Sequence, residues 1–391
     1  FTLKARIMKV SIALVCSLAF SLMLRGADTA LLFRTVSYDK IFELARKEHK
    51  PIMLYFHFNG CGACVNMERT SFRDPEVIKF FNANFVNYAV NTMKGTGIEI
   101  NKIYNVQLHP TMRYLNEKGE ITDKIVGAFS PADFKKKKKD ALDPQKTLSW
   151  FKKQYRRGKR DADFLLDYTH KLRDGYELDS FSINEYLNTQ KDEDLSMEKN
   201  VKFIYQYAIH NTRICFPYGS RAYLFMKANK ELFNKFFSED QVETRLMFIV
   251  QDHVYQAIEK RDRSEFEKAL EDLKYFEKGV EYQYKEMDGR VTMWNSGKYL
   301  VLLAELHFYD AIKDEAGYQN VLQQYLSKIW NDSEALNEIA WEWYEESYDD
   351  KRLEKGLECV MRSIELKSNY NNNDTYAALL YKLGQFEKAE K

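Results

Sequence analysis

The sequence has few of the residues that interrupt regular secondary structure. Among 391 residues there are only 16 glycines and 6 prolines, about half the usual share of these two residue types. A collagen-like, low-complexity or generally disordered chain is therefore excluded. In contrast, 45% of the chain is hydrophobic, with 26 tyrosines, 26 phenylalanines and 5 tryptophans. This composition predicts long helices with short connections around a large core.

The net charge is small, and cysteines are few. The 59 basic and 58 acidic residues leave a formal net charge of +1, so the chain lacks the basic excess of most nucleic-acid-binding proteins. Five cysteines are too few for a fold held together by disulfides. Cys215 and Cys359 stand alone, and we expect them to be buried packing residues, with a disulfide between them as the alternative. The length predicts two or three domains.

An apolar run near the start of the chain is short for a membrane span. It covers residues 10–24 after the basic Lys9, with Met8 as the expected initiator, whereas a transmembrane helix needs about 20 residues. The pattern is typical of a secretory signal peptide, and a retained anchor is the alternative. We expect residues 1–27 to be leader and signal peptide, with no stable membrane span after cleavage. The protein is then exported to the periplasm or cell envelope of a bacterium, or secreted.

Strand and helix patterns alternate over residues 37–150. Four segments have the composition of strands, namely residues 52–58, 85–90, 111–115 and 121–126. The first two are nearly continuous apolar runs, as expected of strands buried on both faces, and the last two form a predicted hairpin with its turn at Gly119. After Gly158 the strand signals stop and apolar residues recur every three or four positions. The sequence therefore predicts an α/β part followed by an all-helical part.

The end of the chain contains a short internal sequence repeat. Residues 340–344 recur as 377–381, and residues 353–356 recur as 386–389, at offsets of 37 and 33. These offsets are close to the 34-residue period of tetratricopeptide repeats, which the region resembles. We expect a helical domain at residues 158–330 and tetratricopeptide-like (TPR-like) repeats at 331–391. Because the chain stops inside an expected helix, we expect the repeats to be truncated.

The strongest chemical signal is the motif Cys61-Gly62-Ala63-Cys64. It follows a buried strand and a break at Asn59-Gly60, and it opens a predicted helix. A helix N-terminus presents unpaired N–H groups and a partial positive charge, so we expect the pKa of Cys61 to be low. Cys64 lies one helical turn further on and can close a disulfide with Cys61. Such a pair can attack a substrate disulfide and then resolve the mixed disulfide.

A second motif, His109-Pro110-Thr111, opens a predicted strand after the cysteine pair. Together with the strands, the cysteine motif and the hairpin turn, it resembles the thioredoxin superfamily over roughly residues 35–150. It looks closest to exported thioredoxin-like domains, and we place the domain at residues 28–157. The resemblance implies a mixed sheet flanked by helices. It also implies that Pro110 is cis and shapes a substrate groove, where the backbone of His109 pairs with the substrate chain.

Several positions depart from the usual pattern of that family. Gly60 stands where a tryptophan is usual, and Ala63 stands where a proline is usual. Tyr55 replaces the buried carboxylate that assists the resolving thiol. These changes are compatible with thiol chemistry, but they leave the redox potential and the direction of electron transfer open.

Two histidines near the cysteine pair are candidates for tuning its chemistry. His57 lies four residues before Cys61, where it could transfer a proton to Cys64, although a purely structural role in the strand is the alternative. His109, if protonated, would favour the reduced form of the pair and make the disulfide more oxidising.

These observations predict an enzyme, an exported thiol–disulfide oxidoreductase that exchanges disulfides with protein substrates through Cys61 and Cys64. Its partners are protein thiols and disulfides, with no nucleic acid, and its only redox group is the disulfide itself, with no cofactor or metal. One alternative is a non-catalytic protein that binds a peptide or partner on its helical repeats and keeps a structural or vestigial cysteine pair. Another is a zinc or copper site formed by the two cysteines with His57 and His109, although a second paired motif is missing.

Overall fold

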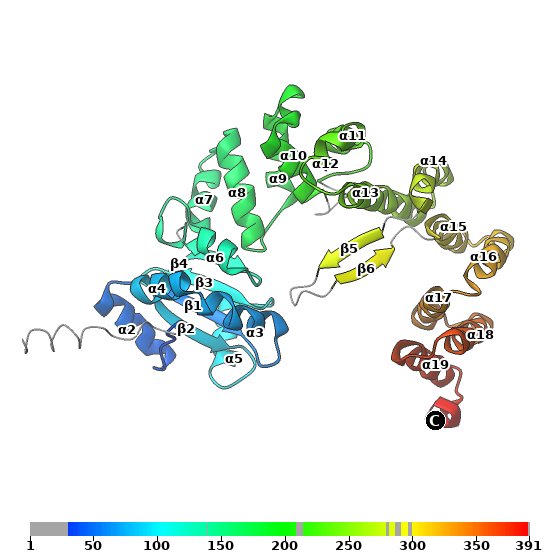
Figure 1. The fold of residues 1–391 in the computed structure, drawn as a ribbon, viewed down its shortest axis with the longest axis horizontal. Helices are drawn as coiled ribbons and strands as arrows, with labels where there is room; N and C mark the ends of the chain where they lie inside the picture. The colour runs from blue at the N-terminus through cyan, green and yellow to red at the C-terminus, as the bar shows by residue number, and fades with distance from the viewer. Residues whose placement is uncertain are drawn as a thin grey trace, which may run out of the picture. The chain divides into compact units, whose positions relative to one another are not determined.

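The computed structural model describes residues 30–138, 140–208, 213, 215–278, 281–285, 291–295 and 299–389. The expected leader at residues 1–27 lies outside them, so the signal peptide stays a prediction. Within the described residues, no helix combines the length and apolar character that crossing a membrane requires. The described residues divide into two compact units, the first running to Leu195 and the second from Ser196 onward. Figure 1 labels the elements of both units.

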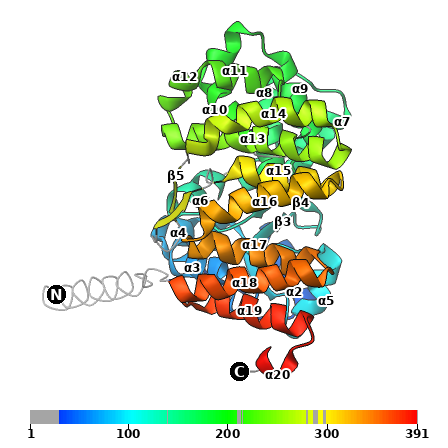
Figure 2. The same ribbon diagram turned by 90° about the vertical axis from the view of Figure 1, so that its right-hand side faces the viewer.

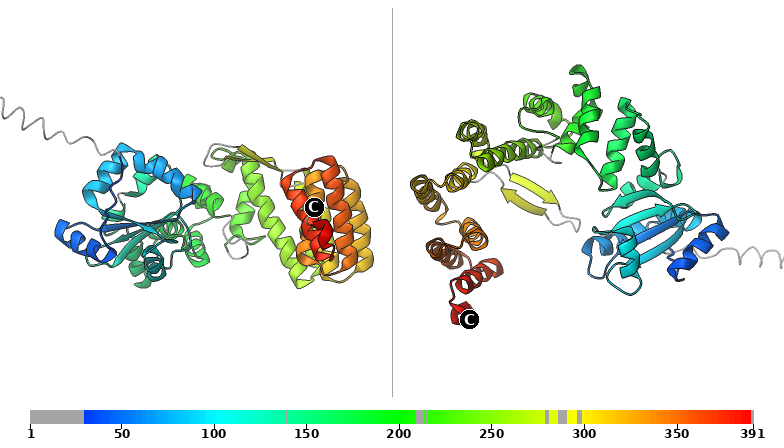
Figure 3. Two further views of the ribbon diagram at one scale, coloured as in Figure 1. Left: turned by 90° about the horizontal axis from the view of Figure 1, so that it is seen from below. Right: turned by 180° about the vertical axis from the view of Figure 1, so that it is seen from behind.

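A four-stranded sheet organises the first unit. Its strands are β1 (Ile52–His57), β2 (Val86–Asn91), β3 (Thr111–Leu115) and β4 (Ile121–Val126), in the order β2-β1-β3-β4. β1 is parallel to β2 and antiparallel to β3, and β3 is antiparallel to β4. The four predicted strands and the mixed sheet are therefore confirmed, and helices cover both faces of the sheet (Figure 3).

The side chains of β1 alternate between two cores. The helices of this part are α2 (Tyr38–Glu48), α3 (Gly62–Arg69), α4 (Pro75–Asn84), α5 (Gly97–Tyr104) and α6 (Pro131–Lys138). Met53 and Tyr55 pack with the cysteine pair and with residues of α3, α4 and α6. Leu54 and Phe56 pack on the other face, with residues of α2 and α5. Because β1 is covered on both faces, its sequence is a continuous apolar run rather than an alternating one.

Asp123 on the edge strand β4 connects the sheet to the helices that follow it. These helices are α7 (Leu148–Arg156), α8 (Ala162–Asp174) and α9 (Ser180–Thr189). The carboxylate of Asp123 is fully buried and accepts hydrogen bonds from the backbone N–H of Leu148 (3.2 Å) and from Nζ of Lys171 (2.9 Å). Burial raises the pKa of Asp123, whereas Lys171 and the backbone donors act in the opposite direction. The first turn of α7 and the body of α8 are thus held to β4.

Helices fill most of the second unit. They are α10 (Glu198–Tyr207), α11 (Arg221–Ala228), α12 (Lys230–Asn234), α13 (Glu239–Lys260), α14 (Arg263–Lys274), α15 (Leu300–Ala311), α16 (Glu315–Ile329), α17 (Ser333–Glu346), α18 (Asp350–Leu366), α19 (Tyr370–Lys382) and α20 (Phe386–Ala389). The predicted helical character of this half of the chain is therefore confirmed.

One two-stranded sheet departs from that prediction. β5 (Glu281–Lys285) and β6 (Val291–Asn295) pair with each other, so the prediction that strand signals stop after Gly158 is wrong at this point. The sequence of β5 alternates aromatic and polar residues, which is a strand pattern. The run is only five residues long and lies between segments with helical periodicity. Its alternation was therefore not recognised as a strand.

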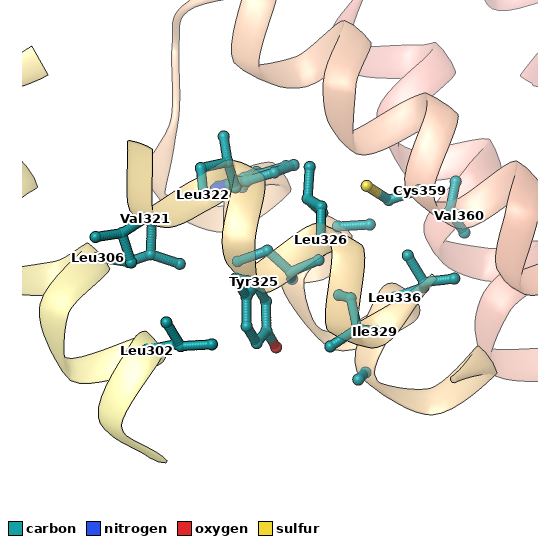
Figure 4. Close-up of a cluster of buried hydrophobic side chains, with 14 of the residues drawn as sticks. Leu302, Leu306, Val321, Leu322, Tyr325, Leu326, Ile329, Leu336, Cys359 and Val360 are labelled. Carbon is teal, nitrogen blue, oxygen red and sulfur yellow. The ribbon is translucent and has the colours of Figure 1, made fainter. Parts of the chain in front are cut away.

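The last helices pack in succession. α15 contacts α16, α17 contacts α18, and α18 contacts α19, and Figure 2 shows them following one another in chain order. A cluster of buried side chains, including Leu322, Leu336 and Cys359, joins these helices (Figure 4). A side-chain carbon placed on Gly356 would lie 3.5 Å from the side chains of Leu379 and Trp343, which is an ordinary van der Waals contact. The helices are confirmed, while their assignment as TPR-like repeats stays a prediction.

Replacing Asp123 with asparagine should strongly destabilise the first unit. The change removes the buried charge nearest to Lys171 and leaves only the more exposed Asp140, 3.7 Å away, as its counterion. Breaking a buried pair by removing one partner typically costs about 3–5 kcal/mol. Denaturant unfolding monitored by circular dichroism measures the loss in the free energy of unfolding. Glu99→Gln is the control, because Glu99 and its partner Lys102 are both exposed and such pairs contribute at most about 1 kcal/mol. Equal effects of the two substitutions would contradict the anchoring role of Asp123.

Candidate functional site

Cys61 and Cys64 are joined by a disulfide, with their Cα atoms 5.3 Å apart. Cys61 is the N-cap residue of α3, and its sulfur accepts a hydrogen bond from the backbone N–H of Cys64 (3.2 Å). The chain enters this cap through Gly60, whose φ of +92° favours a residue without a side chain. When the disulfide opens, the N–H group and the positive end of the helix dipole stabilise a thiolate at Cys61.

The two sulfurs differ in accessibility. Cys61 keeps 6% of its surface exposed, whereas Cys64 keeps 1% and lies within the core beside Met67. Cys61 is therefore the more accessible of the two cysteines. The roles of Cys61 as the nucleophile and Cys64 as the resolving thiol stay predictions.

The loop that contains Pro110 lies beside the end of β1. The His109–Pro110 peptide bond is cis, as the family resemblance implied. Thr111 is the cross-strand partner of Phe56, which brings this loop next to the turn that leads to the cysteines. The ring of His109 packs edge-on against Phe58, with centroids 5.1 Å apart, and its Nε2 lies 2.9 Å from the hydroxyl of Thr92.

Both histidines of the site favour the neutral form. Burial lowers the pKa of His109, and repulsion from His57 lowers it further. Burial also lowers the pKa of His57, against the attraction of Glu68, which raises it. These directions hold for the disulfide form of the pair, in which no thiolate is present. The tuning role of a protonated His109 beside a Cys61 thiolate stays a prediction.

Tyr55 connects the site to a carboxylate that sequence analysis did not identify. The hydroxyl of Tyr55 donates a hydrogen bond to Oε1 of Glu68 (2.9 Å), and the same oxygen lies 3.9 Å from Nδ1 of His57. The ring of Tyr55 stacks on His57 with centroids 5.2 Å apart. Burial raises the pKa of Tyr55, and the charge of Glu68 raises it further, so Tyr55 acts as a hydrogen-bond donor.

Glu68 also lies near Cys64 along the chain. It follows Cys64 by four residues in α3, so both side chains project from the same face of the helix. The i, i+4 spacing was visible in the sequence. The contact between Glu68 and Tyr55 on β1 was not, because it depends on how α3 packs against the sheet.

The remaining candidates do not form a second site. Within the described residues, no group of three or more histidine, cysteine or acidic side chains is placed to hold a metal ion. A metal site on the reduced cysteines with His57 and His109 stays a hypothesis. Cys215 and Cys359 are buried and are not joined in a disulfide. Their predicted packing role is therefore confirmed.

Comparison with known proteins identifies the first part of the chain. Residues 38–142 match the family described as a thioredoxin-like domain, and the four-stranded mixed sheet with its flanking helices agrees with that match. No protein of curated function matches the chain.

Similar solved structures cover the same part of the chain. A thioredoxin from Thermus thermophilus is 25% identical with a TM-score of 0.26, covering 28% of this chain and 85% of that one. A "putative disulphide-isomerase" from Bacteroides thetaiotaomicron is 30% identical with a TM-score of 0.28, covering 29% of this chain and 95% of that one. A DsbH oxidoreductase is 22% identical with a TM-score of 0.26, covering 29% of this chain and 87% of that one.

Replacing Glu68 with glutamine should lower the pKa of His57 further. Glu68 supplies the attraction that raises this pKa, so its removal disfavours the charged imidazole. An NMR titration of the His57 ring signals measures the change. Glu99→Gln, on the exposed surface of α5, is the control and should leave the titration of His57 unchanged. A His57 pKa that stays constant or rises in Glu68→Gln would show that Glu68 does not act on this site.

Proposed function

We propose that this protein, whose residues 38–142 form a thioredoxin-like domain, is an exported thiol–disulfide oxidoreductase that exchanges disulfides with protein substrates. The observation that supports this function is the Cys61–Cys64 disulfide at the start of α3. The cis-proline loop beside it adds a place for a substrate chain. Export is supported by the short apolar run after Lys9.

In the reducing direction, the reaction begins with the dithiol form of the pair. The thiolate of Cys61 attacks one sulfur of a substrate disulfide, a mixed disulfide forms, and the second substrate sulfur leaves as a thiolate that takes up a proton. Cys64 then loses its proton and attacks the sulfur of Cys61. The first substrate sulfur leaves as a thiolate, so two electrons pass from the pair to the substrate. Oxidation of a substrate dithiol is the reverse of these steps.

The local structure assists each of the two attacks. The N-terminus of α3 stabilises the thiolate of Cys61 that makes the first attack. In the reverse, oxidising direction it stabilises the same thiolate when Cys61 leaves the mixed disulfide. For the second attack, Glu68 provides a carboxylate on the face of α3 that Cys64 shares, where it can accept the proton that Cys64 loses. Tyr55 holds this carboxylate through its hydroxyl.

The helical second unit is proposed to bind a partner protein. Tyr348, Tyr370 and Tyr381 lie on or beside its last helices with 89%, 83% and 66% of their surfaces exposed. Aromatic side chains are common at protein interfaces, which supports this role.

Replacing either cysteine should interrupt the reaction at a different step. Cys61→Ser should reduce disulfide exchange to the uncatalysed rate, because the nucleophile is gone. Cys64→Ser should accumulate a covalent complex between Cys61 and the substrate, because the mixed disulfide is no longer resolved. Exchange assays with a disulfide-containing protein measure the rates, and mass spectrometry without reductant detects the complex.

Cys359→Ala is the matched control, because Cys359 is buried in the second unit and is not disulfide-bonded. It should retain the exchange rate of the parent protein. Unchanged turnover in Cys61→Ser would refute the proposed mechanism. Absence of any trapped complex in Cys64→Ser would favour the non-catalytic alternative, in which the pair is structural.

A further inference from the structure

A cavity of about 450 Å³ opens beside the cis-proline loop. Leu108 and Thr111, which lie on either side of the cis-proline, line it together with Arg113 on β3, Lys124 on β4 and Tyr176 after α8. The neighbours of Arg113 on β3 pack with the cysteine pair on the opposite face of the sheet. The cavity therefore belongs to the other face and adjoins the site through the loop.

The strand register places two positive charges directly opposite each other. Arg113 and Lys124 are cross-strand partners, and like charges in such pairs repel. Among the described residues, Nε of Arg113 is buried without a hydrogen-bond partner. A terminal nitrogen of the same side chain donates to the backbone oxygen of Tyr104 (2.8 Å). The guanidinium group of Arg113 therefore has a donor without an acceptor and lies next to a second positive charge.

Glu177 offsets only part of this charge. It pairs with Lys124 (3.2 Å) and also with Lys152 on α7, and its charge attracts Arg113 from further away. Three cations share this carboxylate, so the group retains a positive excess. Positive charge in a partly desolvated recess attracts an anion more strongly than the same charge on an open surface.

We propose that the cavity binds an acidic side chain of the substrate protein, a few residues from the cysteine that Cys61 attacks. This assignment rests on the proposed function and defines its substrate class. A carboxylate can accept charge-assisted hydrogen bonds from the guanidinium group of Arg113 and would offset the positive charge that Arg113 and Lys124 bring to the cavity. Leu108 and Tyr176 keep 40% and 70% of their surfaces exposed, so they offer apolar contact to the stem of a glutamate. A substrate chain lying along the cis-proline loop passes the mouth of this cavity.

The test uses three synthetic peptides that each contain one disulfide and differ only beside the cysteines, where they carry glutamate, glutamine or lysine. The full chain reduces them with dithiothreitol as the electron source, and kcat/KM is measured. The glutamate peptide should exceed the glutamine peptide by about tenfold, the size expected of a charge-assisted hydrogen bond, and the lysine peptide should be the poorest. The preference should shrink as the salt concentration rises.

Variants of the cavity assign the effect to its cations. Arg113→Gln and Lys124→Gln should each remove most of the preference for glutamate, measured as the ratio of kcat/KM for the glutamate and glutamine peptides. Lys124→Gln carries the test if Arg113→Gln does not fold. Lys118→Gln is the matched control, since Lys118 is exposed at the turn of the same hairpin and should keep the full preference.

Each other outcome has a defined meaning. Equal kcat/KM for the glutamate and glutamine peptides would overturn the assignment of the cavity and leave the proposed function standing. If no peptide is turned over, the proposed function fails, and the dissociation constants of the three peptides, measured by fluorescence anisotropy, still decide the assignment. Saturable binding of free glutamate, with no preference among the peptides, would identify a site for small anions and overturn the assignment to a substrate side chain.

Discussion

The burial of β1 on both faces is the constraint on which the rest of the thioredoxin-like domain depends. Its alternating side chains supply one core under α3, α4 and α6 and another under α2 and α5. Because neighbouring strands fix β1 along both edges, its end has a defined position. The turn with Cys61 and the loop with Pro110 meet at that end, so the redox pair is positioned by the same packing that stabilises the domain.

Tyr55 shows how this constraint shapes the chemistry. A carboxylate on a strand buried on both faces would have to be desolvated, which is costly without a partner. A tyrosine at this position instead packs its ring near Phe33 and Phe72 and extends its hydroxyl to Glu68. The negative charge of the site therefore lies on α3, where water still reaches it. The protein keeps a carboxylate near Cys64 without burying one inside the sheet.

The two faces of the edge strand β4 have different roles. Asp123 is buried and anchors α7 and α8 to β4. Lys124, the next residue, projects to the opposite face and belongs to the cationic cavity. The alternation of a strand thus separates a structural ion pair from a surface that is free to bind an anion.

The sequence by itself determined the four strands, the helical second half and the cysteine pair, because continuous apolar runs, three-to-four spacing and C-x-x-C are local patterns. It did not reveal β5 and β6, whose five-residue alternation is weaker than the surrounding helical signal. Only the tertiary structure brought Glu68 into hydrogen-bonding contact with Tyr55 and paired Arg113 with Lys124 across two strands. The burial that lowers the pKa of His109 is also a tertiary effect. Each of these depends on burial or strand register between residues far apart in the chain, and local sequence patterns carry no information on either.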